Sequence, residues 1–226
     1  MIKRLRTNRV FALCYRAAAF VLCLVGLLDT TGVLRGDFKG EMLLFYTTES
    51  NLLVLVMFGL LIARTVVSIR REGTRGPASY HERLSAVVSL AIAVTMLVFW
   101  LLLAPTFGDT AFLLTYINLQ IHLITPLLML FDYLLFAVPG RLKRQDPWLF
   151  TLIPLAYFIQ ATILGFSGYV YTVLPGGPQH FPYFFLDYYT LGGWVFAYGI
   201  AILAVFVGLA YGLLFVDRRR ARRLRP

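Results

Sequence analysis

The chain has 226 residues, of which 59% are hydrophobic and only 14% charged, a balance that excludes an ordinary soluble domain. Its net charge of +10 could indicate a nucleic-acid binder, but Lys and Arg are confined to tails and loops and form no basic face interleaved with aromatic residues. The long apolar runs also lack the polar face that helices of soluble proteins keep. We therefore expect an all-α, polytopic membrane protein, a bundle of six transmembrane helices, with membrane lipids rather than nucleic acid as partners.

Six apolar runs are long enough to cross a bilayer, which takes about 20 residues in a helix. No hydrophilic segment is long enough for a separate soluble domain, so the sequence predicts a single transmembrane domain over 1–226. The first run follows basic residues, as a signal peptide does, but it is too long and lacks a clear cleavage site, so we expect it to be retained. The predicted spans are 10–30, 42–62, 84–103, 112–136, 148–169 and 190–216, followed by a basic tail over 217–226.

The distribution of Lys and Arg predicts the orientation of these spans. Eighteen of these residues fall in the two tails and in the second and fourth connections, which all lie on one side of a six-span protein. Only Arg35 and Lys39 fall on the other side, and Arg16 lies within the first span. Because basic loops stay in the cytoplasm, we expect both termini on the cytoplasmic side of the cell (plasma) membrane. The basic loops and tail are then expected to contact anionic headgroups.

The second predicted span begins with a polar stretch, which is costly at membrane depth and is therefore a candidate functional site. Thr47, Ser50 and Asn51 are spaced i, i+3 and i+4 and share one helix face, whereas Glu49 points away from it. Hydrogen bonds between packed helices would explain the hydroxyl and amide groups without any chemistry. A carboxylate at this depth needs a partner or a proton, so Glu49 is also a candidate for a proton relay.

The fourth predicted span contains the only histidine that lies inside an apolar run. Polar residues recur along it at helical spacing, namely Thr115, Asn118, His122 and Thr125. Pro126 lacks the N–H that would bond to the carbonyl of His122, so the helix can kink there. The histidine could simply donate to a neighbouring helix, or it could act as a general base or proton relay. Both spans start from the same side, so Thr47 and His122 could meet in one half of the bundle.

Further charged residues lie within or beside the predicted spans. Arg16, about one and a half turns into the first span, is expected to extend its side chain to the headgroups. Asp132 could pair with a basic residue at the inner end of the fourth span, or join Glu49 and His122 in a relay. Asp187 is a candidate cap of the last helix. No spacing in the sequence suits a metal site, and we expect no cofactor.

Three short motifs occur in order along the chain: FYTTESNLL at 45–53, HLITP at 122–126 with DYLLF at 132–136, and FPYFFLD at 181–187. In these motifs the chain resembles the bacterial six-span relatives of the androgen-induced membrane protein family. The resemblance implies hydrolysis of fatty acid esters of hydroxy fatty acids by an intramembrane threonine and a histidine. Those residues map onto Thr47 and His122, and the histidine-to-proline spacing is one residue shorter than in the animal members.

Three hypotheses about function follow from the sequence. The first is a threonine-dependent lipid esterase, in which His122 activates Thr47, and Ser50, Asn51 and Asn118 are supporting polar groups that orient the base or hold an oxyanion. The second is a small proton-coupled transporter built on the relay described above. The third is a non-catalytic scaffold whose polar residues only join helices. No signature of a soluble enzyme is present, so an enzyme of this sequence needs an intramembrane site.

Overall fold

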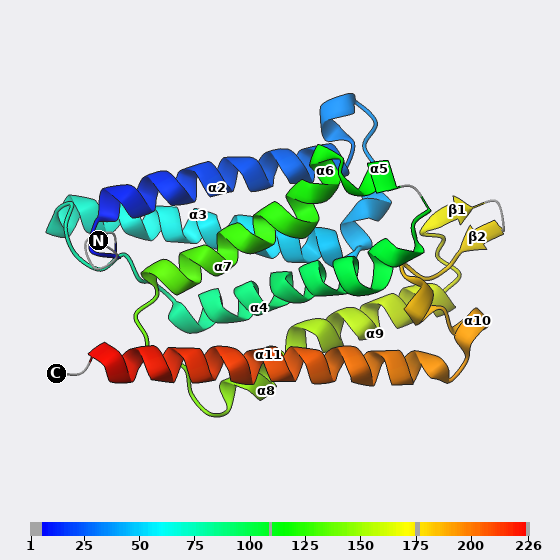
Figure 1. Ribbon diagram of the computed structural model, residues 1–226. Coiled ribbons are helices and arrows are strands. Elements are labelled where there is room, and N and C mark those ends of the chain that lie inside the picture. The colour runs from blue at the N-terminus through cyan, green and yellow to red at the C-terminus, as the bar shows by residue number, and fades with distance from the viewer. Residues whose placement is uncertain (1–5, 109, 175–176, 225–226) are drawn as a thin grey trace.

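The computed structural model describes residues 6–108, 110–174 and 177–224, and within these ranges the protein is almost wholly helical. Six segments are long and apolar enough to cross a membrane, which confirms the prediction of an all-α, multi-pass membrane protein. The first of them begins, and the last of them ends, at the same end of the bundle (Figure 1). Three of the eighteen basic residues behind the predicted orientation lie outside the described residues, namely Lys3, Arg4 and Arg225.

Three spans are single helices, namely α2 (Arg9–Thr30), α3 (Tyr46–Glu72) and α11 (Trp194–Leu224). The other three are built from consecutive helical pieces. The third span contains α4 (Glu82–Val98), the fourth α6 (Tyr116–Leu119) and α7 (Thr125–Phe136), and the fifth α8 (Asp146–Phe150) and α9 (Leu152–Phe166). Each predicted span overlaps one of these segments. The second span was predicted to begin at 42, but the 3-10 helix η2 (Gly40–Leu44) occupies that position and α3 starts after it. The predicted tail over 217–226 is largely helical, because α11 continues through arginines that favour helix.

Short elements cover the end of the bundle away from the start of α2. They are η1 (Val33–Arg35), α5 (Thr110–Leu113), β1 (Thr172–Leu174), β2 (Gly177–Gln179), η6 (Phe184–Leu186) and α10 (Tyr188–Leu191). The two strands pair as an antiparallel hairpin at this end (Figure 1). The Asp187 carboxylate accepts from the backbone N–H groups of Tyr189 and Thr190. The predicted cap is thus present, but it caps α10 rather than the last span.

Two neighbouring spans each contain one π-helical turn. α4 passes into the π-helical turn η3 (Phe99–Leu103) and then the 3-10 turn η4 (Ala104–Thr106), while α6 passes through the π-helical turn η5 (Gln120–Ile124) into α7. A proline follows each π-helical turn after one intervening residue, Pro105 after Ala104 and Pro126 after Thr125. Proline has no N–H to donate, and its ring collides with the carbonyl four residues earlier. A widened turn before the proline relieves that collision.

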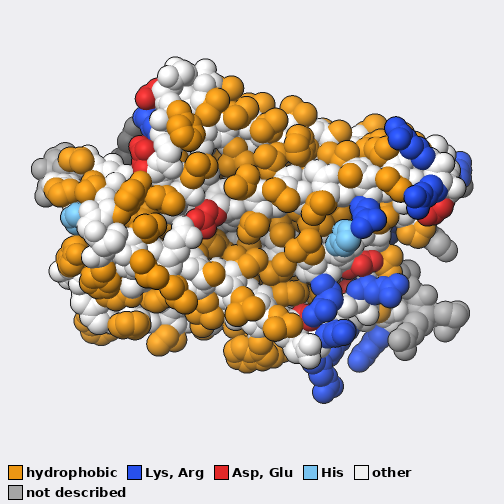
Figure 2. Space-filling model, turned by 180° about the vertical axis from the view of Figure 1, so that it is seen from behind, with side chains coloured by type: hydrophobic (Ala, Val, Ile, Leu, Met, Phe, Trp, Pro, Cys, Tyr) orange, Lys and Arg blue, Asp and Glu red, His pale blue; other side chains and the backbone are white. Residues whose placement is uncertain are grey.

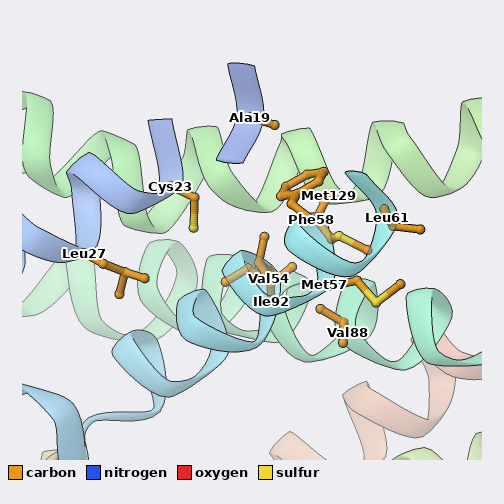
Figure 3. Close-up of a cluster of buried hydrophobic side chains, with 10 residues drawn as sticks. All are labelled: Ala19, Cys23, Leu27, Val54, Met57, Phe58, Leu61, Val88, Ile92 and Met129. Atoms are coloured by element: carbon orange, nitrogen blue, oxygen red, sulfur yellow. The ribbon is translucent and has the colours of Figure 1, made fainter. Parts of the chain in front are cut away.

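α4 is the central helix of the bundle. It contacts α3, α7 and α11, and ten of its seventeen residues are buried. Small residues such as Ser85, Ala86, Ser89 and Ala91 allow the neighbouring helices to approach it closely. Figure 3 shows a cluster of buried hydrophobic side chains that pack between α2, α3, α4 and α7. The cluster comprises Ala19, Cys23, Leu27, Val54, Met57, Phe58, Leu61, Val88, Ile92 and Met129.

Hydrophobic side chains cover most of the face seen in Figure 2, while Lys and Arg side chains gather at one end. This is the end at which α2 begins, α3 ends and α11 ends, and we call it the basic end. The separation of apolar and basic surface along the bundle is the pattern expected of helices that cross a bilayer.

A buried ion pair joins three spans near the basic end. The Arg16 guanidinium on α2 donates from Nε to Asp132 Oδ1 at 2.7 Å and from Nη2 to Asp132 Oδ2 at 3.2 Å, a bidentate contact with α7. It also donates to Thr65 Oγ1 on α3 and to the carbonyl of Ala78 in the connection to α4, both at 2.8 Å. The phenyl ring of Phe136 lies 5.0 Å from the guanidinium carbon.

The expectation that Arg16 extends to the headgroups is therefore wrong. Its side chain is 1% exposed, because four hydrogen bonds inside the bundle replace the hydration that snorkelling would preserve. The expected pairing of Asp132 with a basic residue is confirmed. Arg9, which belongs to the N-terminal tail before the first predicted span, is also buried: it pairs with Glu72 and donates to the Gly73 carbonyl at 2.9 Å, at the end of α3.

We predict that Asp132→Ala destabilises the protein by about 3–5 kcal/mol, because it leaves the Arg16 charge buried and unpaired. The measurement is thermal unfolding of the purified protein in a mild detergent. The double variant Arg16→Met with Asp132→Leu removes both charges and keeps apolar volume, so it should recover most of the loss. A double variant as unstable as the single one would show that packing, rather than the unpaired charge, sets the effect.

Candidate functional site

Thr47 and His122 come together at the end of the bundle opposite the basic end. Thr47 lies in the first turn of α3, and His122 lies in the middle of the π-helical turn η5. The Thr47 Oγ1 and His122 Nε2 atoms are 3.4 Å apart. This is longer than an ideal hydrogen bond. The predicted meeting of the hydroxyl and the imidazole is therefore present in the structure.

The other ring nitrogen of His122 determines the direction of that hydrogen bond. Nδ1 lies 3.2 Å from the backbone carbonyl oxygen of Asn118, which can only accept. In a neutral imidazole Nδ1 then carries the proton and Nε2 presents its lone pair to the Thr47 hydroxyl. Thr47 donates and His122 accepts, which is the protonation state that a nucleophile and its general base require.

Two aromatic residues of the other π-helical turn hold the imidazole. The Phe99 ring stacks on His122 with ring centroids 3.6 Å apart and an angle of 14° between the planes. The Trp100 indole N–H donates to the His122 backbone carbonyl at 3.1 Å. Pro126 cannot donate to this carbonyl, so the indole supplies a donor where the proline removes one. π-helical turns occur frequently at functional sites, and here two of them face each other.

Ser50 and Asn51 hold the first turn of α3 through hydrogen bonds to the Thr47 carbonyl. The Ser50 hydroxyl donates to the Thr47 carbonyl at 3.0 Å and lies 2.7 Å from the Thr95 hydroxyl on α4. The Asn51 amide donates to the Thr47 carbonyl at 2.8 Å and to the Ile121 carbonyl at 3.1 Å. The second contact joins α3 directly to the turn that carries the histidine. In this arrangement Asn51 positions the pair, and its two amide hydrogens are not free to stabilise an oxyanion.

Asn118 also contributes through its backbone rather than its side chain. Its side-chain amide donates to the Leu113 carbonyl at 2.9 Å, whereas its carbonyl orients the imidazole. The other polar residues of this span have separate partners. Thr115 donates to the Phe112 carbonyl, and Thr125 accepts from the Gln120 amide at 3.1 Å.

Tyr183 brings a third hydroxyl to the site, from the segment before α10. Its oxygen accepts from the backbone N–H of Thr47 at 3.4 Å. Burial raises the pKa of the Tyr183 phenol above its usual value, so the hydroxyl stays protonated at neutral pH and keeps a hydrogen to donate. The Tyr183 ring stacks on Phe185, with centroids 5.1 Å apart, which fixes the direction of the phenol.

An apolar cavity of about 260 Å³ opens beside Thr47. Its walls come from α4, α9 and α11 and are almost entirely hydrophobic, with Thr47 and Tyr183 among the few polar side chains. The residues furthest along α11 that line it are Ile202 and Leu203. A site of this kind suits a flexible apolar chain whose polar group lies at Thr47.

The residues of the hypothetical relay are not joined in the described part of the chain. Glu49 points toward α9, where its Oε1 accepts from the Gln160 amide at 2.6 Å. Asp132 is held by Arg16, and His122 by Thr47 and Asn118. Each group thus has its own partners, and among the described residues no hydrogen bond joins one relay member to another.

Sequence reasoning missed Phe99, Trp100 and Tyr183 as parts of the site. For Phe99 and Trp100 the sequence offers one indication, Pro105, which predicts an irregular turn near the end of an apolar span just as Pro126 does. Tyr183 is one of many aromatic residues at this end of the bundle, and its sequence position alone does not distinguish it from an interfacial aromatic.

Comparisons with known proteins do not place this chain. No family model, no curated protein and no solved structure matches it. Among the described residues, no group of three or more His, Cys, Asp and Glu side chains lies close enough to hold a metal ion.

We predict that His122 is a neutral imidazole protonated on Nδ1. The measurement is the ¹⁵N solid-state NMR spectrum of histidine-labelled protein in lipid, in which the signals absent from His122→Gln belong to this residue. The shifts should show a protonated Nδ1 and an unprotonated Nε2, because the Asn118 carbonyl can only accept. Protonation on Nε2 instead would reverse the hydrogen bond and remove the base from the pair.

Proposed function

We propose that the protein is an integral membrane hydrolase that cleaves fatty acid esters, with Thr47 as the nucleophile and His122 as the general base. The observation that carries this proposal is the hydrogen bond from the Thr47 hydroxyl to His122 Nε2, next to an apolar cavity. The sequence resemblance to the androgen-induced membrane protein family supports the same two residues. A threonine hydroxyl is a weak nucleophile on its own and needs a base within hydrogen-bond reach.

In the first half of the reaction, the Thr47 oxygen attacks the ester carbonyl carbon while His122 Nε2 takes the hydroxyl proton. The carbonyl oxygen becomes an oxyanion, and the Tyr183 hydroxyl is the side-chain donor placed beside the nucleophile to stabilise it. As the intermediate collapses, the ester C–O bond breaks and Nε2–H gives its proton to the departing alkoxide. The products of this half are an alcohol and an acyl ester on Thr47.

In the second half, water takes the place of the alcohol. His122 Nε2 removes a proton as the water oxygen attacks the acyl carbon, and the Thr47 oxygen leaves with that proton. The fatty acid departs and the free hydroxyl is restored. The Asn118 carbonyl stabilises the imidazolium formed in each half through Nδ1–H, a role that a carboxylate has in many hydrolases.

We further propose that the basic end faces the cytoplasm and that the protein lies in the plasma membrane. Basic loops are retained in the cytoplasm, and the arginines of α3 and α11 lie at the end where those helices finish. Thr47 and His122 then lie in the outer half of the bilayer. A lipid ester would reach them from within that leaflet, and water would arrive from the outer surface.

We predict that Thr47→Ala abolishes covalent labelling of the purified protein by a fluorophosphonate probe and hydrolysis of fatty acid ester substrates. His122→Ala should lower both rates by about 10²–10⁴-fold, because the nucleophile loses its general base. Both rates are measured in detergent beside the wild type.

Thr48→Val is the matched control, since Thr48 is the next residue, is a buried threonine and makes no hydrogen bond with His122. It should keep the wild-type rates within a few-fold. Labelling that survives Thr47→Ala would contradict the assignment of the nucleophile. If the wild-type protein shows no hydrolysis and the substitutions at Thr47 and His122 change only thermal stability, the scaffold hypothesis would be favoured.

We predict that Leu203→Trp, which fills the cavity, lowers kcat/KM for long-chain esters by about tenfold or more, because each methylene kept out of an apolar site costs roughly 0.8 kcal/mol. Hydrolysis of a short-chain ester should change little. Val205→Trp is the control, because this side chain lies on the same helix, is 52% exposed and does not line the cavity. An equal loss for short and long chains would show that the cavity does not hold the acyl group.

A further inference from the structure

A second hollow, of about 610 Å³, lies at the basic end, where α11 passes the segment before α8. Four arginines surround it: Arg144 from that segment, and Arg218, Arg219 and Arg222 from α11. It is separate from the Thr47–His122 site, which lies at the other end of the bundle. Nothing in the proposed hydrolysis uses it.

The four guanidinium groups are not neutralised by the protein. Within the described residues, none of them forms an ion pair or a hydrogen bond, and no Asp or Glu lines the hollow. The acidic residues nearby are engaged elsewhere. Asp146 is buried against Arg83, and Asp217 accepts from the backbone N–H of Leu142 at 3.2 Å. Four like charges around one hollow repel each other unless an anion lies between them.

The rest of the lining is apolar and lies on the side of the hollow toward the middle of the bundle. Tyr211, Leu214 and Phe215 precede the arginines on α11 by one to two turns. Tyr211 makes an edge contact with Trp148, with ring centroids 6.4 Å apart. Trp148 is 60% exposed, and an exposed tryptophan at the end of a span marks the depth of the lipid headgroups.

We propose that this hollow binds the phosphate-bearing headgroup of an anionic phospholipid, with the acyl chains lying along Tyr211, Leu214 and Phe215. Guanidinium groups bind phosphate oxygens through paired hydrogen bonds, which supplies the missing anion. The change from apolar to basic lining along α11 follows the change from acyl chain to headgroup along a phospholipid. A soluble anion would match the arginines but not the apolar part.

The experiment is a titration of the purified full-length protein in detergent, followed by native mass spectrometry, with phosphatidylglycerol and phosphatidylcholine of the same acyl chains. Phosphatidylglycerol should bind at least about tenfold more tightly. Arg218→Gln with Arg222→Gln should weaken its binding by roughly 25-fold, the equivalent of about 1 kcal/mol for each lost cation. Soluble glycerol phosphate at the same concentration should not displace the lipid.

Arg70→Gln with Arg71→Gln is the matched control. It removes the same charge from exposed positions at the end of α3, also at the basic end but outside the hollow. This variant should bind phosphatidylglycerol within about twofold of the wild type, since exposed charges at a distance are screened. An equal loss in both double variants would show diffuse attraction and overturn the site. Equal binding of the two lipids, or displacement by glycerol phosphate, would also overturn it.

Discussion

Inside a bilayer every backbone carbonyl must be satisfied by the protein itself, and Pro126 removes the N–H that ordinarily satisfies the carbonyl of His122. The chain meets this constraint with the widened turn η5 and with the Trp100 indole, which comes from the widened turn η3 of the preceding span. Because Trp100 is held there, Phe99 lies flat on the imidazole. The position of the histidine ring thus depends on one missing backbone hydrogen.

The threonine is placed by a different device, the start of a helix. α3 begins at Tyr46, so the first-turn N–H groups have no partner within the helix. One of them, on Thr47, donates to Tyr183. Ser50 and Asn51 hold the same turn from the bundle side, and Asn51 reaches across to the turn that carries His122. Irregular backbone on one span and a helix terminus on another therefore define a single site.

Much of this architecture could be predicted from the sequence. The spans follow from hydropathy, because lipid requires about 20 apolar residues in a helix. The shared face of Thr47, Ser50 and Asn51 follows from helical spacing, as does the opposite direction of Glu49, which the contact with Gln160 confirms. These properties are local, since each depends on one helix at a time.

The side-chain contacts between different spans could be predicted only once the packing of the helices was known. Arg16 was expected at the headgroups because an isolated helix has no other way to keep a guanidinium hydrated. Its partner Asp132 lies on another span and is not visible from the first helix alone. The choice between the two roles expected of Asn51 and Asn118, orienting the base or holding an oxyanion, also required the neighbouring helices, because their hydrogen bonds depend on which groups lie nearby. Tyr183 reaches the site from a connecting segment, where sequence periodicity gives no direction.

The Arg16–Asp132 pair also bears on the order in which the protein is assembled during synthesis. The two residues are 116 positions apart, so the ribosome completes the first span long before it makes the partner of its arginine. At roughly 5–20 residues per second, translation supplies Asp132 about 6–23 s later. Thr65, 49 positions after Arg16, is the first partner to arrive. Until the fourth span follows, the arginine of the nascent chain has only the Thr65 hydroxyl and the Ala78 carbonyl among its final hydrogen-bond partners.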